Sequence, residues 1–272
     1  MATLFPSKAP QTITLACWNV NSVRARLPLV EEFLRTASPD VVCIQATKCL
    51  NGDFPREVIE DLGYNIAHHG QKTFNGVAIL SKFPLDDIVC GLPPFSEDEQ
   101  ARYIEAGINV GKDYFRIASV YVPNGQEVGS DKYAYKLNFL KALKEHASEY
   151  MKQGEKMLMC GDYNIAPADR DVHDPKAWHE QVLCSTKERQ AFFEILNLGY
   201  TDVFGFEEPA PFTWWDYRGG SFEKNHGLRI DHILASPDAA DRVSAMTVHK
   251  DVRSFEKTSD HAPISVTLSV KS

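Results

Sequence analysis

The sequence has no long apolar run and no paired-cysteine motif. None of its apolar stretches approaches the roughly 18 residues that a membrane-spanning helix needs. Its six cysteines include no CxxC pair, and Cys17, Cys43 and Cys160 stand in apolar runs, where a free cysteine behaves as a small buried hydrophobe. We therefore expect reduced thiols in a cytoplasmic protein, and neither a disulfide framework nor a zinc site.

The N-terminal segment lacks the apolar core of a signal peptide. It reads MATLFPSKAP, with one lysine and two prolines. We expect residues 1–11 to form a short disordered tail and residues 12–272 to form a single domain. A chain of 272 residues is compatible with one α/β or all-β domain.

The chain also lacks an excess of positive charge. It has 29 Lys and Arg against 37 Asp and Glu, which gives a net charge of −8. That balance argues against a protein that coats nucleic acid electrostatically. It is compatible with an enzyme that binds a polyanion through a small contact area with a metal ion at its centre. Composition therefore favours a soluble enzyme.

Short strand-like runs alternate with helical patterns along the chain. Apolar or alternating runs bounded by turn formers predict strands over 12–20, 41–45, 64–69, 77–81, 104–110, 114–122, 156–160, 212–217, 229–235, 243–248 and 262–270. The turn at 111–113 predicts a hairpin. Apolar residues at helical spacing predict helices within 27–38, 58–62 and 133–152, and the capping box of Ser185 and Glu188 predicts another helix start. This mixture indicates two sheets packed face to face and covered by helices.

Polar residues gather where the predicted strands end. The group comprises Asn19, Asn21, Asp162, Asn164, Asp260 and His261. Each alone is an ordinary turn former or cap. Asp231 is different because it lies inside the apolar run LRIDHILA; a buried carboxylate needs a partner, and His261 is a natural one. Carboxylate and amide oxygens favour Mg²⁺ or Mn²⁺ over zinc, and such an ion stabilises charge on phosphoryl oxygens. These residues alone indicate a magnesium-dependent phosphoesterase.

Eight motifs resemble, in order, those of the exonuclease III family. They are WNVNSVRARL at 18–27, IQATK at 44–48, HGQK at 69–72, VYVPNG at 120–125, GDYNIAP at 161–167, WWDYR at 214–218, GLRIDHILAS at 227–236 and SDHAPI at 259–264. GDYN and SDHAPI are typical of the whole endonuclease/exonuclease/phosphatase superfamily. WNVNSVRARL, WWDYR and GLRID are similar to its DNA-repair branch.

The resemblance implies a fold and an activity. The fold is the deoxyribonuclease I-like α/β sandwich of four layers, in which two packed mixed β-sheets are flanked by helices. The activity is Mg²⁺- or Mn²⁺-dependent cleavage of duplex DNA on the 5′ side of abasic sites, with 3′-to-5′ exonuclease and 3′-phosphodiesterase activities beside it. The expected partner is duplex DNA with abasic sites or 3′-blocked ends. No membrane partner is expected, and the protein is expected to be a monomer.

The resemblance also implies roles for catalytic residues. Asp162 would orient or deprotonate the attacking water, and Asn164 would position the water and the phosphate. His261, held by Asp231, would bind the scissile phosphate and stabilise its developing charge. Tyr121 would contact the same phosphate.

Further residues are implied in metal and DNA binding. Asn19 and Asp260 would lie in or beside the metal shell. Trp214, Leu228 and Ile230 correspond to the family's apolar pocket for an extrahelical abasic deoxyribose. Moving this sugar out of the DNA duplex costs little free energy because it has no base. Contacts with the DNA backbone would come from Lys48, Gln71, Lys72, Asn124 and Arg229.

Position 46 departs from the family. The family has glutamine, glutamate, threonine and lysine where this chain has Gln45, Ala46, Thr47 and Lys48, and that glutamate is a metal ligand. A methyl group cannot coordinate a cation, and Mg²⁺ is usually held by only one or two carboxylates. We therefore expect this chain to be a poor catalyst. The intact state of every other motif favours a deliberate replacement over drift in an inactive paralogue.

Two other functions stay open. The first is a catalytically silent DNA-binding protein, which Ala46 alone supports. The second is a phosphoesterase of the superfamily that acts on inositol phosphates or a lipid headgroup. GLRIDHILA, WWDYR and the absence of membrane-binding features count against the second.

Overall fold

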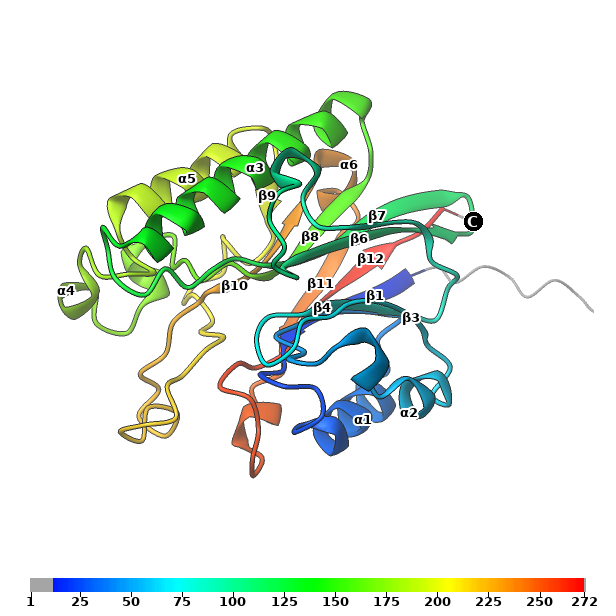
Figure 1. The fold of residues 1–272 in the computed structure, drawn as a ribbon, viewed down its shortest axis with the longest axis horizontal. Helices are drawn as coiled ribbons and strands as arrows, with labels where there is room; N and C mark the ends of the chain where they lie inside the picture. Colours follow the sequence, from blue (N-terminus) through cyan, green and yellow to red (C-terminus); the bar gives the residue numbers. More distant parts are fainter. Residues whose placement is uncertain (1–11, 272) are drawn as a thin grey trace, which may run out of the picture.

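Two six-stranded sheets form the centre of the protein in the computed structural model, which describes residues 12–271 (Figure 1). The expected tail at 1–11 lies outside the described residues. One sheet has the order β11-β12-β1-β2-β4-β3 and the other β5-β6-β7-β8-β10-β9. Only β1–β2 and β7–β8 are parallel among the described strand pairs, so both sheets are mixed. The strands are β1 (Thr12–Asn19), β2 (Val41–Gln45), β3 (Asn65–His69), β4 (Val77–Ser81), β5 (Asp86–Cys90), β6 (Tyr103–Val110), β7 (Asp113–Tyr121), β8 (Met157–Asp162), β9 (Thr201–Asp202), β10 (Asp231–Ala235), β11 (Val243–Val248) and β12 (Ile264–Ser269).

Helices cover the outer faces of both sheets. The long helices α3 and α5 lie over the sheet that contains β7 and β8, and α1 and α2 lie under the other sheet (Figure 1). This arrangement confirms the predicted four-layer α/β sandwich. The helices are α1 (Leu27–Thr36), α2 (Arg56–Glu60), α3 (Asp131–Gln153), α4 (Pro175–Trp178), α5 (Thr186–Leu196) and α6 (Pro237–Ala240), and 3₁₀ turns occur at η1 (Asn51–Asp53), η2 (Pro93–Phe95), η3 (Asp169–Asp171) and η4 (Val252–Ser254).

The alternation of side chains along a strand separates the core into layers. In β1, Ile13, Leu15 and Cys17 belong to the core between the two sheets. Ala16 and Trp18 point the other way and pack in the cluster beneath α1. Both faces of β1 are therefore buried, which explains its nearly continuous apolar sequence.

Most predicted elements form, and the exceptions have local causes. The hairpin at 111–113 joins β6 to β7 with Gly111 at φ 62°, and Ser185 and Glu188 form the predicted capping box of α5. The prediction of a strand over 212–217 is wrong, because Trp214 makes only single bridges to two different segments. Strand β5 was not predicted, because it lies at a sheet edge with most of its side chains exposed and so lacks an alternating apolar pattern. The expected thiols at Cys17, Cys43 and Cys160 are free and buried. No helix within 12–271 has the length and apolar character to cross a membrane.

Candidate active site

Strand register brings the predicted polar residues to one end of the two sheets. Tyr121 ends β7 directly beside Asp162, which ends the parallel strand β8. Asp231 begins β10 opposite Asp162 on its other side. From the other sheet, Asn19 ends β1 and donates from Nδ2 to Asp162 Oδ2 at 2.9 Å. His261 precedes β12, which pairs with β1, so it reaches the same point.

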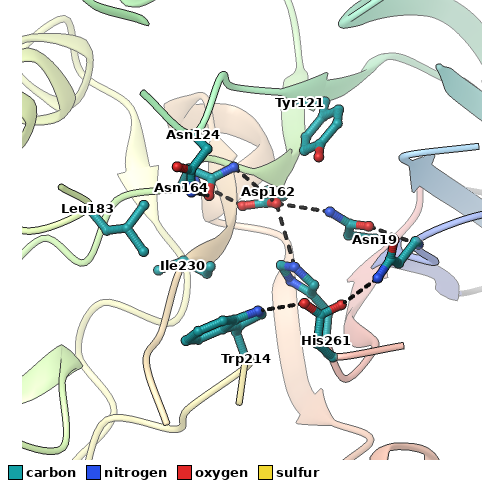
Figure 2. A pocket seen from close by; sticks show the side chains of 11 residues that line it. Asn19, Tyr121, Asn124, Asp162, Asn164, Leu183, Trp214, Ile230 and His261 are labelled. Atoms are coloured by element: carbon teal, nitrogen blue, oxygen red, sulfur yellow. Dashed lines mark hydrogen bonds and ion pairs between the residues drawn. The ribbon is translucent and has the colours of Figure 1, made fainter. Parts of the chain in front are cut away.

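A cavity of about 200 Å³ opens at this convergence (Figure 2). Asp162 lies near its centre, with Asn19, Asn164 and His261 around it. Nine residues expected at the site line the cavity, and Asn21 and Leu183 line it as well. The full lining is Asn19, Asn21, Tyr121, Asn124, Asp162, Asn164, Leu183, Trp214, Ile230, Asp260 and His261.

The imidazole of His261 is held from behind by Asp231. Its Nδ1 lies 2.8 and 3.0 Å from the two carboxylate oxygens of Asp231, and Thr213 Oγ1 donates to the same carboxylate at 2.6 Å. Its Nε2 faces Asp162 Oδ2 at 3.6 Å. Burial disfavours the imidazolium, but the carboxylates of Asp231 and Asp162 outweigh it and raise the pKa of His261 to about 10. The ring therefore presents a fixed, positively charged N–H group to the cavity.

Asp162 combines deep burial with several donors. Its side chain is only 2% exposed, and it accepts hydrogen bonds from the Asn164 backbone N–H at 2.9 Å and from Asn164 Nδ2 at 3.2 Å. Burial raises the pKa of Asp162 to about 6, against the opposing effect of His261. The carboxylate is thus ionised near neutral pH and is a stronger base than an exposed aspartate, a property suited to taking a proton from water.

Two further groups face the cavity beside Asp162. Asn124 Nδ2 donates to Asn164 Oδ1 at 3.1 Å, which links the loop after β7 to the loop after β8. Burial raises the pKa of Tyr121 to about 12, so its hydroxyl is a neutral donor at physiological pH. The guanidinium of Arg102 lies 5.1 Å from the centre of the Tyr121 ring and keeps a positive charge nearby.

Hard oxygen donors occupy the opposite side of the cavity. Asp260 Oδ2 accepts from Trp214 Nε1 at 2.9 Å and Asp260 Oδ1 accepts from Asn21 Nδ2 at 3.2 Å. Burial acts to raise the pKa of Asp260, but the charge of His261 and the Trp214 bond outweigh it and leave that pKa below its usual value. No ion pair within 4.0 Å joins Asp260 to another residue in the described part of the chain. An ionised carboxylate that makes no direct ion pair fits a hard divalent cation.

A second group of ligand atoms supports the same conclusion. Single side-chain atoms of Asp162, Asp231 and His261 lie within 4.8 Å of one another. His261 Nδ1 is already engaged by Asp231, and of the two carboxylates in this group only Asp162 lines the cavity.

The residue at position 46 adds nothing to this donor set. Ala46 directly follows β2, is 1% exposed and has φ 54°. Two residues on, Lys48 Nζ donates to Asn21 Oδ1 at 2.6 Å. Burial lowers the pKa of Lys48 against the attraction of Asp260. The metal side of the cavity thus contains a lysine close to Asp260 and no carboxylate from position 46.

The expected DNA-contacting residues fall into two groups. Trp214 and Ile230 line the cavity, Asn124 is at its rim, and Leu228 lies behind the wall, where it pairs with Trp214 through the backbone. Lys72 is exposed, and Gln71 lines a neighbouring groove that shares Asn124 with the cavity. Lys48 is half-buried beside Asn21.

Arg229 needs a correction. Its side chain is 1% exposed, and it donates to Asp171 at 2.8 Å and to Asp202 at 2.6 Å. A guanidinium committed to two internal carboxylates cannot contact the DNA backbone directly. Its role in this structure is to cross-link η3 and β9.

Three residues of the site were missed by sequence reasoning. Asn21 was noted as polar but given no role, although its amide touches Asp260 and Lys48. Leu183 and Thr213 had no local signal, because an apolar loop residue and a threonine beside two tryptophans are ordinary. The φ of 77° at Leu183 is visible only in the structure.

Known proteins of similar sequence and structure match nearly the whole chain. The model of the Endonuclease/Exonuclease/phosphatase family matches residues 16–261. Exodeoxyribonuclease III of Haemophilus influenzae is 35% identical over 91% of this chain and 96% of its own length. A Neisseria 3′ phosphatase, solved bound to a product DNA hairpin, is 39% identical with a TM-score of 0.89, covering 95% of this chain and 100% of that one. An AP endonuclease from Archaeoglobus fulgidus is 35% identical, with the same TM-score and coverage.

Proposed function

This chain belongs to the endonuclease/exonuclease/phosphatase family, in its exonuclease III and AP endonuclease branch, and from that premise we propose that it is a Mg²⁺- or Mn²⁺-dependent DNA-repair phosphodiesterase. Its proposed reaction is cleavage of duplex DNA on the 5′ side of an abasic site. The observation that carries the proposal is the placement of Asp162 and His261 against an apolar wall within one cavity.

The proposed chemistry divides between a base and a charged donor. Asp162 takes the proton of the attacking water, and Asn164, bound to Asp162 through two hydrogen bonds, orients that water. His261 directs Nε2–H toward a phosphoryl oxygen and stabilises the negative charge that develops on it. Asp231 keeps the ring in this orientation, because it engages Nδ1 from the rear. Tyr121 donates its hydroxyl to the same phosphate.

The cation has a defined set of candidate ligands. Asp260 would hold it with its carboxylate, and Asn19 would assist with its amide oxygen. When bound, Mg²⁺ or Mn²⁺ supplies positive charge against phosphoryl oxygens. Because Ala46 contributes no donor, we expect weak metal binding and slow cleavage in this chain.

The shape of the cavity favours a sugar without a base. Its volume of about 200 Å³ is below the ~300–1,000 Å³ of ordinary small-molecule sites. Trp214, Ile230 and Leu183 give it an apolar side that offers no partner to a polar base edge. A whole nucleotide must also be unstacked and unpaired before it leaves the helix, at a few kcal/mol. An abasic deoxyribose avoids most of that cost.

The same cavity would accept a sugar phosphate at a 3′ end. We therefore include 3′-to-5′ exonuclease and 3′-phosphodiesterase activities in the proposal, with 3′-blocked DNA ends as substrates. We also propose that the protein acts as a monomer.

A second candidate is a DNA-binding protein with little catalysis, and Ala46 is the observation that favours it.

DNA-binding affinity distinguishes a protein that is specific for damaged DNA from a general nuclease. We expect this chain to bind a duplex with a central abasic analogue more tightly than the matched intact duplex at near-physiological salt, and Trp214→Ala to erode the difference. Equal affinities for the two duplexes would refute the abasic-site proposal. Competition by inositol phosphates at the same site would instead support the phosphoesterase alternative.

A further inference from the structure

We propose that a buried ion pair, Lys136 with Glu188, is a positioning device that sets the active-site loops. The pair lies behind the cavity, between α3 and the start of α5, which are side by side above β8 (Figure 1). The inference rests on the proposed function, because it concerns Asn164 and Asn124, which would hold the water and the phosphate. Neither Lys136 nor Glu188 lines the cavity itself.

The ammonium of Lys136 is fully occupied by three acceptors. The side chain is 0% exposed, and Nζ donates to the backbone carbonyls of Asn164 at 2.6 Å and Asn124 at 3.1 Å. Its third partner is Glu188 Oε1. A lysine ammonium has three donors and no acceptor, so one charged group ties the loop after β7 and the loop after β8 to the same helix.

Glu188 extends this connection to the opposite wall of the cavity. Its Oε1 accepts from the backbone N–H of Leu183 at 3.0 Å. Its Oε2 accepts from the backbone N–H of Ser185 at 3.1 Å and from Ser185 Oγ at 2.5 Å. Glu188, which belongs to the predicted capping box, therefore also fixes Leu183, and Leu183 lines the cavity. Three loops of the cavity meet at one buried pair.

The local backbone explains why such a connection is needed. Asn164 has φ 50°, a left-handed conformation that costs free energy for a residue other than glycine. Gly125, with φ 92°, is packed so closely that an added Cβ would lie 3.1 Å from Lys136 Cδ. The two bonds to backbone carbonyls hold both turns in place.

Stability alone does not account for the pair. Replacement of a buried ion pair by neutral groups of similar size is often harmless to stability, whereas removal of one partner leaves an unpaired charge. Orientation is different, because an apolar side chain of similar size has no donor with which to hold the two carbonyls. Misplacement of a reacting group by about 1 Å can cost roughly a hundredfold in rate.

The test compares two paired substitutions in the Ala46→Glu background. Lys136→Met with Glu188→Gln removes both charges, while the amide oxygen introduced at position 188 keeps an acceptor for the backbone N–H of either Leu183 or Ser185. The control is Arg242→Met with Asp113→Asn, which neutralises a buried pair with a 2.7 Å contact at the opposite end of β7 from Tyr121. Turnover, DNA affinity and melting temperature are measured for each protein, with kinetics well below every melting temperature.

We expect the Lys136/Glu188 double substitution to lower kcat about tenfold or more, with DNA affinity within about threefold of the parent. The control should keep kcat within about twofold even if its melting temperature falls further. A Lys136/Glu188 variant that is folded and turns over at the parent's rate would overturn the inference. If that variant does not fold, Glu188→Gln alone decides: a folded protein with unchanged kcat also overturns it. An inactive Ala46→Glu parent would instead refute the proposed function, and this inference with it.

Discussion

Placing a glutamate at position 46 should strengthen binding of a divalent cation by at least about tenfold. Asp260 is the carboxylate assigned to the cation, and a glutamate at position 46 adds a second negative charge. Two unit charges about 4 Å apart interact by ~4 kcal/mol at an effective dielectric of 20. Part of this interaction energy is offset. The new carboxylate must be desolvated, it is repelled by Asp260, and its attraction to Lys48 competes with its attraction to the cation. A net gain of about 1.4 kcal/mol is a tenfold change in affinity, and even outer partners of a metal site are worth roughly 10–100-fold.

The backbone presents no obstacle to this substitution. Ala46 already adopts φ 54° with a Cβ atom, so a glutamate adds no new backbone strain. The assay is calorimetric titration of Mn²⁺ into the DNA-free protein, followed by cleavage across a Mg²⁺ series. Ala46→Gln is the matched control, because it has nearly the same shape without the charge. Equal Mn²⁺ affinity in Ala46→Glu, Ala46→Gln and the present chain would refute the ligand assignment.

The site and its surroundings lead to three further predictions. In the Ala46→Glu background, Asp162→Asn and His261→Ala should each lower kcat by about a hundredfold or more while DNA affinity stays within about tenfold; near-full turnover in either variant would remove that residue's role. The cleavage rate should rise with pH through about 6, since the pKa of Asp162 is raised to about 6 by burial and only its ionised form accepts a proton; a rate that is flat between pH 5 and 7 would contradict this. Arg229→Met should reduce the free energy of unfolding by about 3–5 kcal/mol and leave the DNA affinity of the folded protein unchanged, as measured by urea denaturation and DNA titration. Arg229 and His232 overcome the effect of burial and lower the pKa of Asp202 to about 2 from 3.8, so the stabilisation from Asp202 is present above pH 3.8 and is lost as the pH falls toward 2. A large loss of DNA affinity with unchanged stability would restore Arg229 to the DNA contacts.

The strands that carry the site are easier to predict from the sequence than the side-chain contacts between those strands and distant segments. Asp231 stands out because a carboxylate inside an apolar strand needs a partner, and the structure places it against His261. Arg229, two residues earlier, offers no such clue. Its partners Asp171 and Asp202 are 58 and 27 residues away, and local sequence contains no information about which distant carboxylates a buried arginine will meet.

Loop geometry is the part that sequence patterns miss. Leu183 reaches the cavity only because its loop turns through a left-handed conformation and is fixed by Glu188. The segment 212–217 is rich in aromatic residues, as strands often are, yet Trp214 faces the cavity, Trp215 is buried in the interior and Tyr217 is half exposed. The backbone hydrogen bonds of this segment join it to Leu228 and to Asp260, which lies near the C-terminal end of the chain. These pairings depend on tertiary contacts rather than on local propensity.

One measurement bears most directly on the proposed function. A duplex labelled on the 5′ end of one strand, with a single central abasic analogue in that strand, is incubated with the Ala46→Glu protein and Mg²⁺. The products are resolved beside a marker that ends in a 3′-hydroxyl. We predict a single cut at the phosphodiester on the 5′ side of the abasic analogue, no internal cut in the matched intact duplex, and loss of the cut in Asp162→Asn. Cleavage of both duplexes at many internal positions, or no cleavage of either at any Mg²⁺ concentration, would contradict it.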